Sequence, residues 1–305
     1  MLGSEGCLGI ITSATVRIWP LPNVRDFESV LLRDFDHGLQ FLRGVSRQGE
    51  SRIPASIRLL DNEHFRLGQA MRPKDSTMSE QIGRALKKLW VGIQGSSLDP
   101  LRVVCAIINY EGSQEEVLEQ KRIIAHHCAL HEGIRLGPSL GKAGYNLTFM
   151  IAYLRDFAMT FHLLGESFET FSPWSAVDKI VQATKERIRK EHATRFLPGK
   201  PFIGCRVTQI YHEGVCLYFY FAMNFENVDN ASAVFSAIEH SARAEILRRG
   251  GSLSHHHGVG KVRSAFLKDI DSPAFQDAIQ SIKRSMDPEQ IFGAQNGPFS
   301  HQESE

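Results

Sequence analysis

Hydrophobic and polar residues alternate along this chain with two spacings, a period of two that predicts strands and a period of about 3.6 that predicts helices. The first spacing predicts strands at 7–18, 27–32, 55–59, 103–110, 134–136, 163–171, 202–212 and 215–225. The second predicts helices at 36–47, 62–70, 79–90, 114–131, 145–161, 174–192 and 231–251, and a mostly helical segment over 262–293. We expect the strand at 7–18 to end at the prolines of WPLP, because proline cannot donate to a ladder.

Local signals refine this pattern. Ser113 and Glu116 form a Ser-x-x-Glu capping box at the start of the 114–131 helix. Glu213-Gly214 lies between two strongly apolar strands and predicts a hairpin. In the second of these strands, alternation puts Tyr218 and Tyr220 on one face, opposite Leu217, Phe219 and Phe221. The order of elements predicts an α+β fold, with an antiparallel sheet and helices on one face.

Composition and charge exclude several classes of protein. The 305 residues carry 35 basic and 34 acidic side chains, a net charge of +1, so no overall field attracts nucleic acid or an anionic membrane. The five cysteines include no C-x-x-C pair, which argues for reduced thiols and against a disulfide framework or a zinc knuckle. The longest apolar run, at 216–223, is too short to cross a bilayer. Any recognition of an anion must therefore be local.

A glycine-rich turn, GSEGCLG at 3–9, precedes the first apolar run and leaves backbone amides open to a phosphate. By itself this pattern is more often an ordinary turn before a strand. The longer string GSEGCLGIITSATVRIWPLP resembles the G-S-E-G-T-L-G-I-I-T segment of the vanillyl-alcohol-oxidase and p-cresol-methylhydroxylase type of FAD-binding proteins. The resemblance implies that the turn lies against FAD; the corresponding residues are Ser4, Glu5, Gly6, Cys7, Leu8, Gly9 and Ile10. Cys7 replaces the threonine of that pattern, so only the backbone role carries over.

Further strings narrow the resemblance. PASIRLLDN, IAYLRD, LGESFETFSPW, CRVTQIYHEGVCLYFYF and GGSLSHHHGVGK occur in order and are similar to the C-terminal half of the alkylglycerone-phosphate synthase family. The resemblance implies the end of a PCMH-type FAD-binding domain at 1–24, a cap or substrate domain at 25–261 and a helical segment at 262–305. We therefore expect the rest of the FAD-binding domain to be missing from this chain.

The family resemblance also implies an activity. Its members exchange the acyl chain of 1-acyl-dihydroxyacetone phosphate for a long-chain fatty alcohol, with FAD as a covalent catalyst and no net redox change. The expected partners are these two lipids and, for the full-length protein, a second copy in a homodimer. The family is peroxisomal and peripheral to the lumenal face of the membrane, although this chain shows neither its N-terminal signal nor a C-terminal S-K-L.

The resemblance assigns individual roles. Tyr218 corresponds to the family's proton donor or acceptor, Arg58 to an arginine required for activity and Arg155 to a substrate-binding arginine, whose guanidinium suits a phosphate. Each has a structural alternative. Tyr218 could be a core aromatic residue, and the arginines could form ion pairs with Asp61 and Asp156.

Three adjacent histidines, His255, His256 and His257, are the chain's most unusual string. Adjacent side chains point in different directions and seldom bind one metal ion, so we expect no metal here. The resemblance implies a loop beside the flavin that could stabilise charge around Tyr218. For this loop, the alternatives are an ordinary polar loop and a zinc site. For the chain as a whole, they are an inactive fragment that binds lipid or a partner, and an FAD-dependent oxidase.

Overall fold

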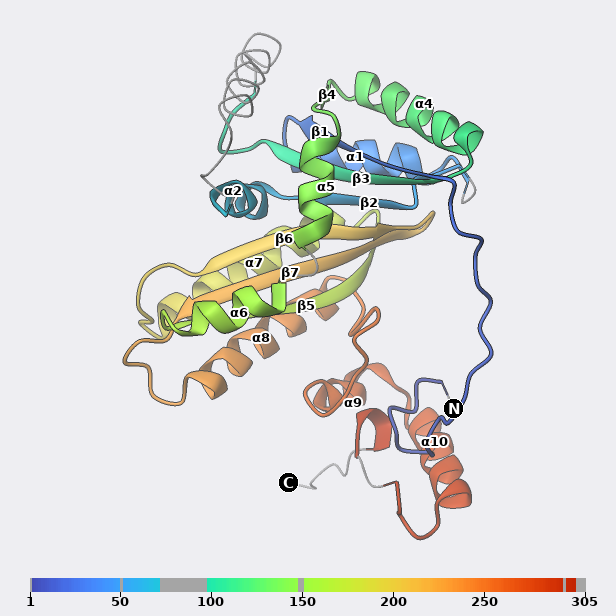
Figure 1. Ribbon diagram of the computed structural model, residues 1–305. Coiled ribbons are helices and arrows are strands. Elements are labelled where there is room, and N and C mark those ends of the chain that lie inside the picture. The colour runs from blue at the N-terminus through green and yellow to red at the C-terminus, as the bar shows by residue number, and fades with distance from the viewer. Residues whose placement is uncertain (1, 50–51, 72–97, 148–150, 293–294, 300–305) are drawn as a thin grey trace. The chain divides into compact units, whose positions relative to one another are not determined.

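The computed structural model describes residues 2–49, 52–71, 98–147, 151–292 and 295–299. It divides into two compact units (Figure 1): residues 1–20 and 252–305 form unit 1, and residues 21–251 form unit 2. These units group the chain differently from the expected ranges 1–24, 25–261 and 262–305, because the two ends of the chain pack together. The assignment of those ranges to family domains stays a prediction. The helix expected at 79–90 lies outside the described residues.

Unit 2 contains a seven-stranded sheet in the order β4-β1-β3-β2-β6-β7-β5. Every neighbouring pair in this sheet is antiparallel. The strands are β1 (Val24–Leu32), β2 (Ser56–Leu60), β3 (Val104–Gly112), β4 (Ile134–Arg135), β5 (Leu163–Pro173), β6 (Phe202–Ile210) and β7 (Gly214–Asn224). The short β2–β6 pairing, in which Leu59 and Leu60 face Val207 and Arg206, joins the two halves of the sheet. Strands were expected at all of these places.

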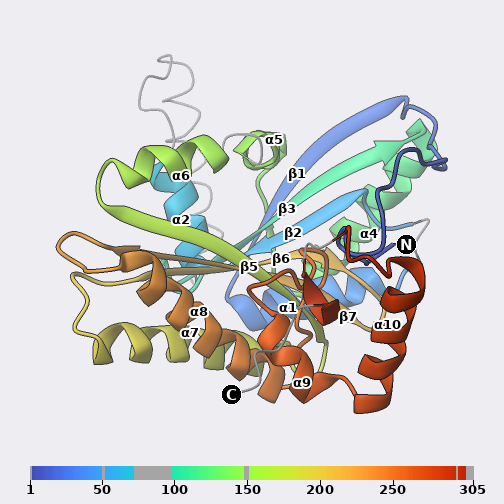
Figure 2. The same ribbon diagram turned by 90° about the horizontal axis from the view of Figure 1, so that it is seen from below.

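Helices cover the sheet mainly on one face, as Figures 1 and 2 show, and this face carries the largest core cluster. The helices of this layer are α1 (Phe35–Ser46), α4 (Gln114–Leu130), α7 (Val177–Thr194) and α8 (Ala231–Arg248). The shorter helices of unit 2 are α2 (Asn62–Ala70), α5 (Pro138–Leu147) and α6 (Ile151–Met159). The α+β class with an antiparallel sheet is confirmed, and α5 adds partial cover on the opposite face of β1 and β3.

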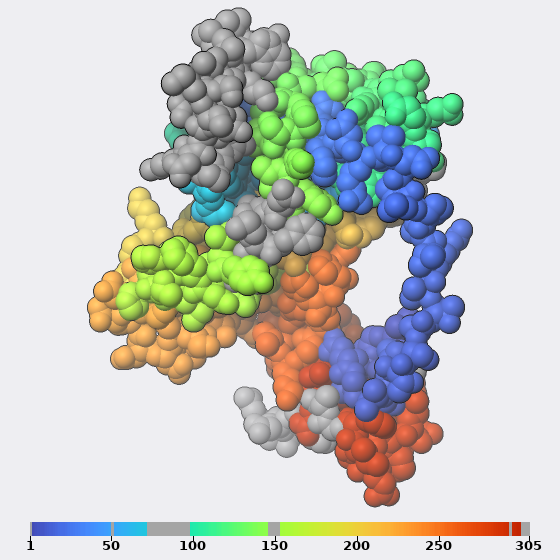
Figure 3. All heavy atoms as spheres, in the orientation of Figure 1, coloured from blue at the N-terminus to red at the C-terminus, as the bar shows by residue number. Residues whose placement is uncertain are grey.

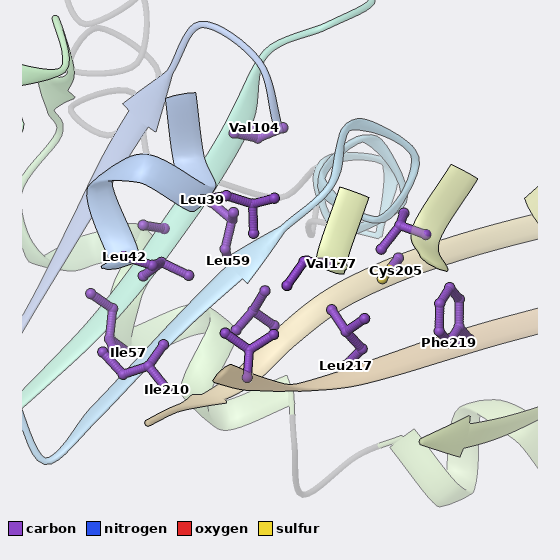
Figure 4. Packing of buried hydrophobic residues seen from close by; sticks show 14 of the residues in the cluster. Leu39, Leu42, Ile57, Leu59, Val104, Val177, Cys205, Ile210, Leu217 and Phe219 are labelled. Carbon is purple, nitrogen blue, oxygen red and sulfur yellow. The ribbon is translucent and has the colours of Figure 1, made fainter. Parts of the chain in front are cut away.

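The core forms where α1 and α7 pack against alternate residues of the strands (Figure 4). Ile57, Leu59, Leu217 and Phe219 are at most 3% exposed. Gly38 lets α1 approach closely, because a Cβ there would lie 2.6 Å from Leu59 Cδ2. Burying each such side chain contributes about 1.5–3 kcal/mol, so this face of the sheet is fixed toward the helices.

Both local signals in the sequence are confirmed. The Ser113 hydroxyl accepts a bond from the Glu116 amide at 3.2 Å, and the Glu116 carboxylate accepts one from the Ser113 amide at 2.7 Å. The β6–β7 hairpin closes where the Tyr211 amide donates to the Gly214 carbonyl at 2.8 Å. Gly214 is required there, since a Cβ would lie 2.2 Å from the Ser172 carbonyl oxygen.

The strand expected at 7–18 is wrong. Residues 9–20 form no strand, and their backbone pairs with no strand among the described residues. Ile10, Ile18 and Trp19 are 76%, 82% and 83% exposed, and Figure 3 shows the blue segment as a narrow run of atoms. The β-branched composition favours an extended chain, but a strand also needs a neighbouring backbone, which the described chain does not supply.

Unit 1 contains α9 (Leu267–Ile270), α10 (Pro273–Met286) and two short 3-10 turns, η1 (Ser264–Phe266) and η2 (Gly297–Phe299). The helical character expected over 262–293 is therefore confirmed for its central part. No helix among the described residues is long and apolar enough to cross a membrane.

Candidate active site

The second face of the sheet, opposite the main helical layer, carries the predicted Tyr218. In β7, Leu217, Phe219 and Phe221 are buried in the core, whereas Tyr218 and Tyr220 point to the second face, as the alternation predicts. The two tyrosine rings lie 5.6 Å apart, tilted by 30°. Tyr218 is thus half-buried on the second face while its strand neighbours occupy the core, and its role in proton transfer stays a prediction.

Two arginines share this face. Arg206 of β6 is the register partner of Tyr218, and its guanidinium carbon lies 5.2 Å from the centre of the Tyr218 ring and 5.0 Å from that of Tyr220. Arg58 of β2 points the same way, because Ile57 and Leu59 beside it point into the core. Burial lowers the pKa of Arg58, and the nearby positive charge of Arg206 lowers it further. The face therefore concentrates positive charge next to two phenols.

This environment acts on both phenols. Burial raises the pKa of Tyr220 to about 12, although Arg206 and Arg58 favour its anion. Burial also raises the pKa of Tyr218, while Arg206 and a hydrogen bond with Ser167 act in the opposite direction. Glu169 and Cys216 disfavour the Tyr218 anion through their own negative forms. A proton-transfer role for Tyr218 thus depends on its cationic neighbour.

His64, at the start of α2, completes this group of residues. The centre of its ring lies 4.8 Å from the centre of the Tyr220 ring, and the two rings are arranged edge to face. The side chain is 6% exposed, and its Nδ1 has no hydrogen-bond partner in the described structure. Burial, with the positive charges of Arg206 and Lys185, lowers the pKa of His64 to about 3. His64 is therefore neutral at ordinary pH and supports the Tyr220 ring.

Arg58 and Arg155 differ in whether they form the ion pairs considered as structural alternatives. The carboxylate of Asp61 accepts bonds from the amides of His64 and Cys205 at 2.8 and 2.7 Å and pairs with Lys185 at 2.6 Å, so it does not pair with Arg58. Arg155, on α6, does form ion pairs, with Glu166 at 2.9 Å and with Asp156 at 3.6 Å. These carboxylates are 51% and 73% exposed, and water screens such pairs strongly. Arg155 could therefore exchange them for a phosphate.

In unit 1, the glycine-rich turn and the histidine loop are joined by one carboxylate. The Glu5 side chain accepts hydrogen bonds from the amides of Val259 and Gly260 at 2.6 and 2.7 Å. Gly258, at φ +78°, makes room for it, because a Cβ there would lie 2.5 Å from Glu5 Oε1. Two motifs about 250 residues apart in sequence thus form one structure, which the sequence did not predict.

Cys7 is fully buried in the same unit. Its sulfur accepts a bond from the Asn296 amide at 3.3 Å, and its carbonyl accepts one from Lys283 Nζ at 2.7 Å. Lys283 also pairs with Asp287, whose carboxylate receives the amides of Ile291 and Phe292. The Cys7 thiol is therefore bonded within unit 1, and its carbonyl is held by Lys283.

The three histidines come immediately before the glycines of this loop. His255 Nδ1 lies 2.9 Å from His256 Nδ1, and the rings of His256 and His257 meet at 4.7 Å with planes 72° apart. The rings thus contact one another edge to face, and the turns at Gly258 and Gly260, both with positive φ, direct the chain back to Glu5. The structure places Tyr218 and Arg58 on one face of the sheet in unit 2, and it brings the histidine loop and the 3–9 turn together in unit 1. The predicted action of the histidines on Tyr218 stays a prediction.

The turn at 3–9 fits a cofactor with an extended phosphate-bearing chain. Gly3 and Gly6 have φ of +80° and +81°, and a Cβ built on either would meet no atom within 4 Å. Such a turn exposes backbone amides without side-chain obstruction. Ser4 is 8% exposed, and Glu5 and Cys7 are occupied within the unit. The residues that remain for contact with a ligand are Gly3, Gly6, the half-buried Leu8 and Gly9, and the exposed Ile10.

Comparison with known proteins identifies the relatives of this arrangement. The family of FAD linked oxidases, C-terminal domain, matches residues 21–296. The chain belongs to this family. It is 37% identical to the alkyldihydroxyacetonephosphate synthase of Caenorhabditis elegans over 97% of this chain and 49% of that protein.

Solved structures agree. One of an alkyldihydroxyacetonephosphate synthase matches with a TM-score of 0.74 and 25% identity, over 95% of this chain and 48% of that one. The p-cresol methylhydroxylase structure, at 12% identity and a TM-score of 0.56, shares the fold over 90% of this chain and 52% of its own. The chain spans about half the length of the relatives it matches. The resemblance to the synthases is confirmed, and FAD is the cofactor that family membership indicates.

Proposed function

We propose that this chain supplies the substrate half of an alkylglycerone-phosphate synthase. The protein would exchange the acyl chain of 1-acyl-dihydroxyacetone phosphate for a long-chain fatty alcohol, which yields alkyl-dihydroxyacetone phosphate and a free fatty acid. The observation that carries the proposal is the set of two phenols and two arginines on the second face of the sheet. It occurs in a chain whose relatives bear the synthase name. The exchange cleaves one C1–O bond and forms another, so it requires no net oxidant.

Tyr218 would transfer the proton at C1 of the substrate. As a phenolate it would accept that proton and later return it to C1. The proton that the alcohol loses when its oxygen bonds to C1 would leave with the fatty carboxylate, as the free fatty acid. Arg206 and Ser167 favour the anion that this step needs. When bound, FAD would supply covalent, non-redox catalysis, held in part by the backbone of Gly3 and Gly6.

Arg155 and Arg58 would hold the substrate phosphate. A guanidinium offers paired N–H donors that match phosphate oxygens, and it keeps its charge in an apolar surrounding. Arg155 has exposed carboxylate partners that it could release. Arg58 is half-buried near Arg206, where an anion would relieve the repulsion between the two guanidiniums. His255, His256 and His257 would stabilise charge near the reacting carbon, as the family resemblance implies.

The full-length enzyme, incubated with acyl-dihydroxyacetone phosphate and a labelled fatty alcohol, tests this proposal. We expect equal amounts of labelled alkyl product and free fatty acid, with no oxygen consumed. Tyr218→Phe should lower kcat by roughly 10²–10⁴-fold. Tyr211→Phe, in the β6–β7 hairpin, is the matched control and should be active. Oxygen uptake, or full activity of Tyr218→Phe, would contradict the proposal.

Arg155→Ala should raise KM for the acyl substrate about 10–100-fold, because a charged hydrogen bond contributes about 1.5–3 kcal/mol.

We further propose that the full-length protein acts as a homodimer at the lumenal face of the peroxisomal membrane, where both lipid substrates partition. Cell fractionation and imaging of the full-length protein test this location, and a soluble cytosolic distribution would contradict it.

A further inference from the structure

Arg206 holds an unusual position among the arginines of unit 2. It projects from the middle of the sheet onto the second face, directly across from Tyr218 in the β6–β7 register. Its guanidinium lies over both tyrosine rings, 5.2 and 5.0 Å from their centres. Among the described residues it forms no ion pair, and its Nε is buried without a hydrogen-bond partner. Its position is therefore set by the two rings and not by a carboxylate.

The groups around Tyr218 explain why a cation there matters. Those that face the ring come from three strands: Ser167 and Glu169 from β5, Arg206 from β6, and Cys216 and Tyr220 from β7. Arg58 from β2 and His64 from α2 contribute at Tyr220. Burial, Glu169 and Cys216 all oppose ionisation of Tyr218. Among these groups, Arg206 is the cation that acts on Tyr218, with its guanidinium carbon 5.2 Å from the centre of the ring.

We propose that Arg206 is the positioning residue for Tyr218, because its guanidinium fixes the plane of the Tyr218 ring and stabilises its phenolate. A cation over an aromatic face is attracted by the ring's electrons, and the attraction increases when the ring carries a full negative charge. A flat guanidinium can stack on two rings at once, which the compact ammonium of lysine cannot do. The consequence for catalysis rests on the proposed function, whereas the effect on the phenol does not.

Tyrosine labelled with ¹³C in the purified chain gives a direct test. NMR would follow ionisation of Tyr218, identified by the signal missing in Tyr218→Phe, at alkaline pH values at which the fold persists. Arg206→Met should reduce the ionised fraction of Tyr218 about tenfold at fixed pH, since loss of the cation raises the pKa of this phenol. Arg206→Lys should keep most of the charge effect but broaden the signal as the ring loses its fixed plane.

Controls separate this role from a structural one. Arg189→Met removes an exposed arginine that pairs with Glu63 at 3.0 Å and should leave the titration of Tyr218 unchanged. If Arg206→Met does not fold, Arg206→Gln is a neutral replacement that can still form hydrogen bonds. Unchanged ionisation of Tyr218 in a folded, neutral Arg206 variant would overturn the inference.

Activity of the full-length enzyme gives the second readout. If Tyr218 is the base, Arg206→Met should move the rising limb of the pH profile to higher pH and lower kcat more than it raises KM. A changed titration of Tyr218 with an unchanged pH profile supports the positioning role and contradicts the proposed function of Tyr218. Lost activity with an unchanged titration overturns the positioning role.

Discussion

Glu5 illustrates how a single side chain can hold together distant parts of a chain. Its backbone is in the left-handed region, at φ +50°, and its carboxylate receives two amides from the loop that follows the histidines. A non-glycine residue in that conformation costs free energy, which charge-assisted hydrogen bonds can offset. Glu5, expected from the resemblance to contact FAD, is therefore first a structural residue of unit 1.

Replacing Glu5 by glutamine tests this role. Glu5→Gln keeps the shape but offers one neutral acceptor in place of two charged ones, so unit 1 should lose about 1–3 kcal/mol of stability. Hydrogen exchange at the Val259 and Gly260 amides should accelerate accordingly. Glu289→Gln, an exposed change in the same unit, is the control and should leave exchange at these amides unaltered.

His64 makes the stability of unit 2 depend on pH. The folded state holds its pKa at about 3, against 6.5 in the unfolded chain, so the unfolded state binds the extra proton between these values. Stability is therefore complete above pH 6.5 and falls as the pH decreases toward 3, by up to about 1.4 kcal/mol per unit.

Denaturant titrations of wild type and His64→Phe at several pH values between these limits would measure the effect. Phenylalanine keeps an aromatic ring against Tyr220 but cannot titrate. The free energy of unfolding of His64→Phe should therefore decrease less steeply than that of wild type as the pH falls, by up to about 1.4 kcal/mol per pH unit. His212→Asn, in an exposed hairpin turn, should leave the slope as in wild type. Equal slopes for wild type and His64→Phe would mean that His64 is not protonated on unfolding.

At the scale of elements, Asp61 joins α2, β6 and α7 at one point. It caps α2 through the His64 amide, accepts a bond from the Cys205 amide and pairs with Lys185, which is 8% exposed. Asp61→Ala should cost about 3–5 kcal/mol, because it leaves the Lys185 charge buried without a partner.

The double variant Asp61→Asn with Lys185→Met should recover much of that loss, since it removes both buried charges while asparagine can still cap the helix. Urea denaturation measures each variant. Glu119→Gln, at an exposed pair with Arg52, should have little effect. A double variant no more stable than Asp61→Ala would show that the hydrogen bonds, and not the charge, dominate.

Elements with their own local signals could be predicted from sequence. Ser113 and Glu116 specify the start of α4, and the alternation of β7 gives the correct face for Tyr218. The segment at 7–18 has the same β-branched composition but no partner strand, so composition alone gave the wrong answer. Pairing partners come from residues far away in the chain, and a local pattern does not contain them.

For the whole molecule, the candidate site was predicted in part. Tyr218, Arg58 and Arg155 came from family motifs, whereas Arg206 and His64 did not, although Arg206 lies within the quoted string CRVTQIYH. The signal for Arg206 was its alternation with the core residues Cys205 and Val207, which directs it to the tyrosine face once β6 and β7 are paired. His64 carried no such signal, because its place beside Tyr220 depends on how α2 packs on β6.

At the same scale, we predict that the 305-residue chain purified alone is colourless and does not retain FAD. Within unit 1, Glu5 and Cys7 already use their side chains internally, which leaves backbone at Gly3 and Gly6 and apolar side chains such as Ile10 for the cofactor. A few amides do not offset the loss of freedom of so large a ligand.

Visible absorbance of the purified chain and calorimetric titration with FAD would measure this. We expect no flavin spectrum and no saturable heat, while the full-length protein, prepared in parallel as the positive control, should be yellow. Gly6→Ala in the full-length protein should weaken its retention of FAD, because the added Cβ occupies the open side of the turn at a positive φ. A yellow 305-residue chain with one flavin per molecule would show that these residues alone bind the cofactor.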